Sequence, residues 1–239
     1  MRDSPTTEPG STDTGPESVY EALRMRIIQH DLEPGERISI GDEARRLGVS
    51  QTPVREALHR LEGDSLVVRS ASRGYDVTAP IDLDGLVALF EVRLLLEPWA
   101  AREAATERLT NPGPQLRTEL EALAALHGDD RSTQARRALR DRQFHLRILQ
   151  ASGNELLPST FERLHAHVHI FRLYQTDSEG GTTHREHQAI ARAIEDCDPD
   201  AAEQAMRAHL MGSFSRLSAV FSTEPRAARR PRDARARLR

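Results

Sequence analysis

The chain has 239 residues, of which 38% are hydrophobic and 29% charged, and these proportions are ordinary for a globular protein with one large or two small domains. The formal net charge of −4 excludes a polycation, so any binding to nucleic acid must depend on local clusters of basic side chains. A single cysteine, Cys197, excludes an internal disulfide framework, and the lack of a secretory signal or of an apolar run long enough to cross a membrane predicts a cytoplasmic protein without a membrane partner.

The N-terminal segment predicts a disordered leader followed by a helix. Residues 1–16 are rich in proline, glycine, serine, threonine and acidic side chains, a composition typical of disorder. Ser18 and Glu21 have the spacing of a capping box, and apolar residues follow at helical intervals, which predicts a helix from Ser18 to about Asp31. The sequence Leu32–Gly35 then predicts a turn.

Two further helices are expected close together. The first is short and runs from about Gly41 to Leu47, and Gly48 follows it where a helix C-cap tolerates positive φ. Ser50 is placed to cap the next helix, and Pro53 falls in its first turn, where a missing N–H group is tolerated. The predicted buried stripe of this helix is Val54, Ala57, Leu58 and Leu61.

A β-hairpin is expected after these helices. Its strands are predicted at 66–68 and 75–78, with Arg73 and Gly74 at the tip between them. The order of helix, short helix, glycine turn, helix and hairpin is that of a winged helix-turn-helix. We therefore predict such a DNA-binding domain over residues 17–80.

The last helix of this domain is the candidate reader of DNA, because a helix fits the major groove and its N-terminal side chains reach the base edges. The other expected contacts are to the phosphate backbone, and a glycine at the wing tip would allow close approach to the minor groove. The predicted DNA-binding residues are Arg45, Arg46, Ser50, Gln51, Thr52, Arg55, Arg73 and Gly74. The alternative for the arginines is an ordinary solvated surface.

The rest of the chain predicts an all-helical bundle over residues 81–223, followed by a disordered basic tail over 224–239. Helices are expected near 82–107, 113–127, 132–151, 154–175, 183–196 and 199–222. The pair Gly180–Gly181 is predicted to break the chain of helices, with Thr183 as the next N-cap. Asp198, followed by a proline, is predicted to cap the last helix.

Four potential metal ligands fall on apolar faces of this bundle. Asp141 and His145 are four residues apart and lie on one helix face, while His187 and His209 each fall on the apolar stripe of another helix. A buried imidazole or carboxylate must be paired or ligated, and one ion would satisfy all four. This donor set suits a divalent ion, with zinc first and nickel or manganese as alternatives. At each position the alternative is an ordinary hydrogen-bonded core residue.

The N-terminal motifs closely resemble those of the GntR family of bacterial transcription regulators. The matching pieces are Leu32–Gly35, Arg37–Ile38, Gly48–Leu61 (GVSQTPVREALHRL) and Arg73–Val77. The resemblance implies sequence-specific DNA binding. Gln51 stands where the family often has arginine, and Gly41 stands where some members place a DNA-contacting arginine, so the operator sequence is not implied.

The helical part resembles the FCD ligand-binding domain of the FadR subfamily. The matching pieces are Glu91-x-Arg93 with Glu97, Asp141-x-x-Phe144-His145, Ala151–Asn154, Glu186–Ile190 and Ala208–Leu210. In metal-containing members the ion is bound by an Asp, the His four residues on and two later His, so the resemblance implies this role for the four residues described above. It also implies a small organic-acid effector near the ion and near Arg93. The alternative for Arg93 is a surface ion pair with Glu97.

Together these features predict a homodimeric, ligand-responsive regulator and not an enzyme. We expect a repressor that binds a pseudo-palindromic double-stranded operator and is released by a small carboxylate effector. Two alternatives remain. One is a metal-dependent enzyme in which the Asp/His set activates water, and the other is a regulator whose effector is the metal ion itself.

Overall fold

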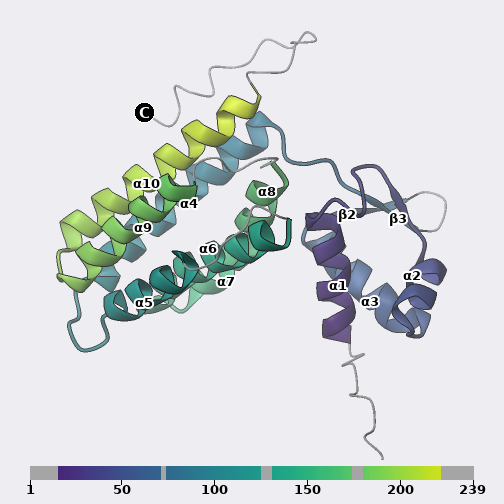
Figure 1. Cartoon of the computed structure of the whole chain (residues 1–239), viewed down its shortest axis with the longest axis horizontal. Coiled ribbons are helices and arrows are strands. Elements are labelled where there is room, and N and C mark those ends of the chain that lie inside the picture. The colour runs from purple at the N-terminus through teal and green to yellow at the C-terminus, as the bar shows by residue number, and fades with distance from the viewer. Residues whose placement is uncertain (1–15, 71–73, 125–130, 174–179, 222–239) are drawn as a thin grey trace, which may run out of the picture. The chain divides into compact units, whose positions relative to one another are not determined.

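The chain folds into two compact units (Figure 1). The computed structural model describes residues 16–70, 74–124, 131–173 and 180–221. The first unit ends at Thr78 and the second begins at Ala79. The predicted leader, except for Pro16, the predicted basic tail and Arg73 lie outside the described residues.

The first unit is a winged helix-turn-helix, which confirms the predicted fold. Its elements are α1 (Pro16–Ile28), β1 (Arg37–Ile38), α2 (Ile40–Leu47), α3 (Gln51–Gly63), β2 (Val67–Ser70) and β3 (Gly74–Val77). The strands form an antiparallel sheet in the order β1-β3-β2, in which Tyr75 pairs with both Ile38 and Arg69. Strand β1 was not predicted, because two residues are too few to show an alternating pattern.

Local sequence explains how α2 and α3 are joined. Gly48 ends α2 with a left-handed φ of 68°, which a glycine adopts without strain. The backbone N–H of Val49 then donates to the carbonyl of Ala44 at 3.0 Å, so the chain turns sharply into α3. The apolar stripe of α3 is buried as predicted and packs on α1: Val54, Ala57, Leu58 and Leu61.

Helix α1 differs from the prediction at both ends. It already includes Pro16, so Ser18 lies in its first turn and is not the N-cap. It ends at Ile28 because His30 takes a positive φ of 58° and the N–H of Asp31 donates back to the carbonyl of Arg26. This backward hydrogen bond is typical of a helix that ends in a left-handed residue.

The second unit is an all-helical bundle, as predicted. Its helices are α4 (Leu83–Ala104), α5 (Gly113–Ala124), α6 (Arg131–Ala151), α7 (Leu156–Arg163), α8 (Ala166–Leu173), α9 (Gly180–Glu195) and α10 (Pro199–Val220). Helix α10 packs along α4 and α9, α6 packs against α4, and α5 packs against α9 (Figure 1). Within the described residues, the helices lack the combination of length and apolar sequence that a membrane crossing requires.

Two predicted boundaries in this unit are wrong. The helix expected over 154–175 is two helices, α7 and α8, because His165 takes a left-handed φ of 45° between them. The pair Gly180–Gly181 forms the first turn of α9, so Thr183 lies inside that helix and is not its N-cap. Asp198 does cap α10, since its Oδ1 accepts the N–H of Ala201 at 3.0 Å.

Apolar side chains from several helices fill the centre of the bundle. Phe90 of α4, Leu149 of α6, Ile190 of α9 and Leu210 of α10 are all fully buried. The ring of Phe90 lies edge-on to that of Phe214, with 5.6 Å between the centroids. Charged and imidazole side chains inserted into such a core must be compensated by partners, and several such side chains are present there.

Candidate DNA-binding face and metal centre

Helix α3 presents a polar face to solvent. Gln51, Thr52 and Arg55 are exposed, and Ser50 occupies the N-cap position with an exposed hydroxyl that makes no side-chain cap hydrogen bond. A Cβ at Gly41 would lie 3.8 Å from Nε2 of Gln51, so the start of α2 lies beside the start of α3. The predicted reading residues therefore share one accessible end of this unit.

The exposed arginines on α2 and α3 differ in their availability. Arg45 forms an ion pair with Asp42 one turn earlier. Arg46 and Arg55 are exposed, and within the described residues neither pairs with a carboxylate. Phosphate contacts by Arg46 and Arg55 would therefore require no intramolecular ion pair to be broken.

Polar contacts between α1 and α3 fix the orientation of the reading helix. The hydroxyl of Tyr20 donates to Oδ2 of Asp64 at 2.5 Å, and burial, reinforced by this carboxylate, raises the pKa of Tyr20. The guanidinium of Arg60 lies 4.0 Å above the Tyr20 ring and donates to Glu17 at 2.7 Å. Arg60 is thus occupied in holding α3 on α1.

Gly74 was predicted at the tip of the hairpin, but in the structure it is the first residue of β3. It is buried at the start of β3, where a Cβ would lie 3.2 Å from the carbonyl oxygen of Ile38. The close approach of β1 explains the glycine, so we do not include Gly74 among the proposed DNA contacts. The other predicted wing residue, Arg73, lies outside the described part of the chain.

Three buried histidines from three helices meet inside the second unit. His145 of α6, His187 of α9 and His209 of α10 each place a ring nitrogen within 4.8 Å of the other two. The Nε2 atoms of His187 and His209 are 3.3 Å apart. Oδ1 of Asp141 lies 3.5 Å from Nε2 of His187 and 3.9 Å from Nε2 of His145. The four predicted ligands are therefore brought together, with the partly exposed Asp141 at the side that faces solvent.

Two carboxylates that sequence reasoning missed hold the outer nitrogens of this cluster. Oε2 of Glu97 lies 2.6 Å from Nδ1 of His145, and Oε2 of Glu186 lies 2.8 Å from Nδ1 of His209. A carboxylate can only accept in the hydrogen bond with His209, so this ring carries its proton on Nδ1 and turns the lone pair of Nε2 toward the cluster. A charged residue on the apolar stripe of α4 was a signal for Glu97, whereas the contact of Glu186 depends on tertiary packing alone.

Protonation of two of the three imidazoles is disfavoured. Burial, with smaller contributions from the neighbouring cationic groups, lowers the pKa of His187. Burial also lowers the pKa of His209, although the hydrogen bond to Glu186 opposes this shift. Burial would raise the pKa of Glu97, but Arg93 and His145 outweigh it and lower the pKa to about 2. Three imidazoles beside the carboxylate of Asp141 form the kind of donor set that divalent metal ions bind. The residues present thus fit a metal ion.

Arg93 pairs with Glu97, but the pair is buried, so the alternative of a surface ion pair is wrong. Nε of Arg93 donates to Oε1 of Glu97 at 2.5 Å, and the two side chains are 3% and 1% exposed. Nη2 of Arg93 lies 3.5 Å from Nε2 of His145. The ring of Phe144 stacks on that of His187, with 4.2 Å between the centroids. Arg93 therefore borders the cluster directly.

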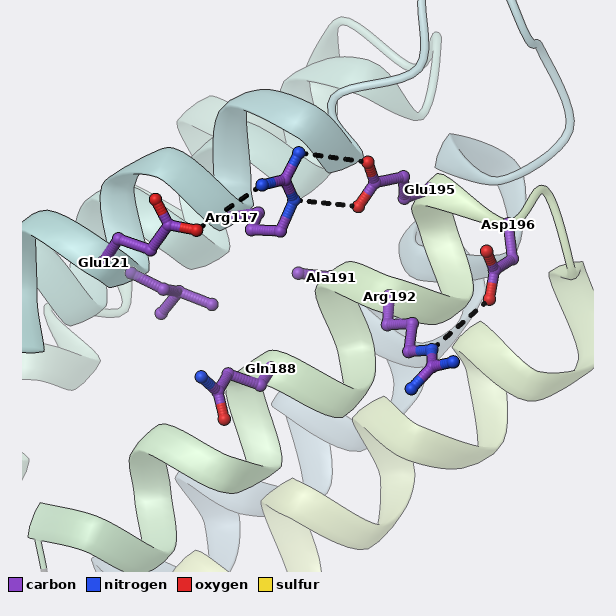
Figure 2. A pocket seen from close by; sticks show the side chains of 8 residues that line it. Arg117, Glu121, Gln188, Ala191, Arg192, Glu195 and Asp196 are labelled. Carbon is purple, nitrogen blue, oxygen red and sulfur yellow. Dashed lines mark hydrogen bonds and ion pairs between the residues drawn. The ribbon is translucent and has the colours of Figure 1, made fainter.

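A separate groove with a volume of about 410 Å³ lies between α5 and α9 (Figure 2). In Figure 2, Arg117 reaches both Glu121 and Glu195, at 3.4 and 3.2 Å, and Arg192 faces Asp196 at 3.7 Å. These charges at the rim already pair with one another. Because the predicted effector residue and metal ligands do not line this groove, we do not assign the effector to it.

Two family profiles cover most of the described chain. Residues 16–77 match the profile of bacterial regulatory proteins of the gntR family, and residues 88–212 match the FCD domain. These spans coincide closely with the winged helix-turn-helix and with the helical bundle that carries the cluster.

Individual proteins show the same pattern. The chain is 30% identical over 208 residues to the uncharacterized HTH-type transcriptional regulator YdhC of Bacillus subtilis (strain 168), and the match covers 84% of this chain and 90% of the relative. It is 29% identical over 201 residues to the HTH-type transcriptional repressor RspR of Escherichia coli (strain K12), covering 81% and 85%. The solved structure of E. coli McbR/YncC superposes with a TM-score of 0.69 at 21% identity, over 88% of this chain and 100% of that one, which supports the fold.

Proposed function

The chain belongs to the gntR family of bacterial regulatory proteins and carries an FCD domain, and from this premise we propose that it is a transcriptional repressor that a small carboxylate releases from DNA. The first unit would bind the operator, and the second would bind the effector at or beside a divalent metal ion. The similarity to RspR, which is named as a repressor, supports this sign of regulation. Since bacterial transcription takes place in the cytoplasm, we also place the protein there.

The buried cluster is the observation that carries the effector part of the proposal. Three imidazoles in an apolar core are costly to desolvate unless each is paired or ligated. We propose that Asp141, His145, His187 and His209 hold a divalent ion, for which zinc suits the nitrogen-rich donor set and nickel or manganese are alternatives. When bound, such an ion supplies Lewis-acidic coordination positions that a carboxylate oxygen can occupy.

Arg93 is the residue that we propose to hold the effector carboxylate. Burial opposes its charge, but the carboxylate of Glu97 outweighs this effect and raises the pKa of Arg93, so the guanidinium stays protonated. A guanidinium has five donors in a planar fork, so it can bind Glu97 on one edge and a second carboxylate on another. Its Nη2 already faces the cluster, 3.5 Å from His145.

DNA binding is assigned to the exposed face of α2 and α3. The proposed contacts are Arg45, Arg46, Ser50, Gln51, Thr52 and Arg55. A glutamine pairs well with adenine and an arginine with guanine or phosphate, so this face combines base reading with phosphate binding.

A homodimer would place two such faces on a pseudo-palindromic operator. The second unit offers a surface for this contact, because Leu95 and Trp99 of α4 are 76% and 42% exposed and Met211 of α10 is 40% exposed. Large apolar side chains in solvent on two adjacent helices are typical of a contact between protein chains.

An operator selection followed by titration tests the proposal. Duplexes selected from a random pool are expected to bind the purified protein more tightly than random duplex, and zinc with a panel of small carboxylates is expected to weaken that binding. A failure to prefer any selected duplex would refute the DNA-binding assignment. A response to zinc alone would identify the ion itself as the effector, and turnover of a carboxylate in the same samples would favour the enzyme alternative.

A further inference from the structure

A chain of charged hydrogen bonds runs from α10 to the cluster. Arg216 donates through Nη1 to Oε1 of Glu186 at 2.7 Å and through Nη2 to Oε2 of Glu186 at 2.8 Å. The same carboxylate then contacts Nδ1 of His209 at 2.8 Å. Two parallel donors fix the plane of a carboxylate as well as its position.

The Glu186 carboxylate determines which ring nitrogen of His209 carries the proton and which carries the lone pair. Since an ionised carboxylate only accepts hydrogen bonds, Nδ1 of His209 must donate, and the lone pair lies on Nε2. Nε2 is the atom that approaches Nε2 of His187. An outer hydrogen bond of this kind sets the tautomer and ring plane of a metal ligand.

We propose that Arg216 is a positioning residue of the metal centre, which acts through Glu186 to fix the ring orientation and tautomer of His209. This inference rests on the proposed metal-binding role of the cluster. Arg216 would act on His209 through the Glu186 carboxylate, to which it donates twice.

A second chain with the same chemistry supports this interpretation. Arg93 donates to Glu97, and Oε2 of Glu97 lies 2.6 Å from Nδ1 of His145. The two series of contacts reach the cluster from different helices and end on different histidines. The pattern of arginine, glutamate and imidazole therefore occurs twice around one cluster. Of the two arginines, Arg216 is the one suited to a test, because Arg93 itself borders the proposed effector site.

The local sequence of α10 leaves room for this contact. A Cβ at Gly212 would lie 3.0 Å from Oε1 of Glu186 and 3.1 Å from Nη1 of Arg216. Both atoms are at the ends of flexible side chains, so an alanine at this position would displace the pair and not the backbone. Glycine is otherwise unfavourable inside a helix, and this crowding gives a reason for it.

The test compares Arg216→Met with Arg207→Met in the full-length protein. Arg207 is on the same helix but is half exposed, and its ion pair within the described residues is with Glu203 at 3.6 Å, so its substitution controls for the loss of a cation from α10. Zinc affinity would be measured by competition with a chromophoric chelator. Arg216→Met is expected to weaken zinc binding about tenfold, the lower end of the range for outer partners of a metal ligand. Arg207→Met is expected to change it less than about twofold, and Arg216→Lys to recover only part of the loss, because an ammonium cannot donate as a planar fork.

A second measurement separates this inference from the proposed function. In metal-free protein with ¹⁵N-labelled histidine, the imidazole shifts of His209 are expected to report the Nδ1–H tautomer, and Arg216→Met is expected to mix it with Nε2–H. If the unsubstituted protein binds no zinc, the metal part of the proposed function fails, and the tautomer comparison alone decides the role of Arg216. An unchanged tautomer in Arg216→Met, or a zinc affinity equal to that of Arg207→Met, would overturn the inference.

Gly212→Ala keeps the test decisive if Arg216→Met does not fold. Alanine favours the helix, so thermal stability is expected to be retained or increased, while zinc affinity falls because Glu186 is displaced. Retained stability with unchanged zinc affinity would contradict the inference.

Discussion

Removing one member of the buried ion pair between Arg93 and Glu97 is expected to destabilise the second unit strongly. The two side chains are 3% and 1% exposed, so Arg93→Met leaves the Glu97 carboxylate charged inside the core without its main partner. Breaking a buried pair in this way costs about 3–5 kcal/mol, whereas an exposed pair four residues apart on a helix contributes about 0.3–0.5 kcal/mol. The tenfold difference between these values makes the experiment decisive.

Urea unfolding of metal-free protein measures this loss. The single tryptophan, Trp99, lies on α4 with both residues of the pair, so its fluorescence reports on this unit alone. With a slope of about 2 kcal/mol per molar urea, the expected loss lowers the unfolding midpoint by roughly 2 M. Arg192→Met is the matched control, because Arg192 and Asp196 form an exposed pair with the same spacing.

The double variant Arg93→Met/Glu97→Met adds a second check. It removes both charges and is expected to be more stable than Arg93→Met alone, although His145 then loses the carboxylate beside its Nδ1. A loss for Arg93→Met below about 1 kcal/mol, similar to that of Arg192→Met, would refute the reasoning from burial.

Four other outcomes are expected. Arg55→Ala should weaken operator binding by about 1–3 kcal/mol in fluorescence anisotropy, with the urea midpoint of the first unit unchanged. His209→Ala should lower bound zinc, measured by elemental analysis, while affinity for the operator is retained. Stability of the second unit should fall as the pH drops below 6.5, because His187 takes up a proton in the unfolded chain while the buried ring resists it. It should fall again between pH 4.5 and about 2, because Glu97 is protonated in the unfolded chain before it is protonated in the folded one. Urea unfolding midpoints measured across this pH range check both losses. Leu95→Glu should shift a dimer toward monomer in sedimentation velocity, because it places a charge on an exposed apolar surface.

Each of these has a contradicting result. Unchanged operator affinity would remove Arg55 from the reading face, and full zinc occupancy would remove His209 from the ligand set. A flat pH profile between pH 7 and 3 would mean that the lowered pKa values do not describe the folded protein. An unchanged sedimentation coefficient would place any dimer contact elsewhere than Leu95.

Helical periodicity predicted the inward side chains but not their partners. The stripes that carry His187 and His209 repeat at regular spacing, so their burial follows from each helix alone. The pairing of Glu186 with His209 depends on how α9 lies against α10, which no single-helix pattern contains. The break at His165 was missed for a related reason, because its left-handed φ is not accompanied by a glycine or proline that would indicate it.

The proposed metal centre and the proposed dimer surface are linked through α4, which carries Arg93 and Leu95, and through α10, which carries His209 and Met211. Arg93 faces the cluster and Leu95, two residues on, faces solvent, while on α10 the same relation holds between His209 and Met211. A carboxylate that pulls on Arg93 would therefore move α4 at the surface where the second subunit is proposed to bind. For this to release DNA, the effector must bind the free protein more tightly than the operator-bound protein, and the operator must weaken effector binding by the same factor. Equal effector affinity in the presence and absence of operator would exclude this route, however tightly the carboxylate binds.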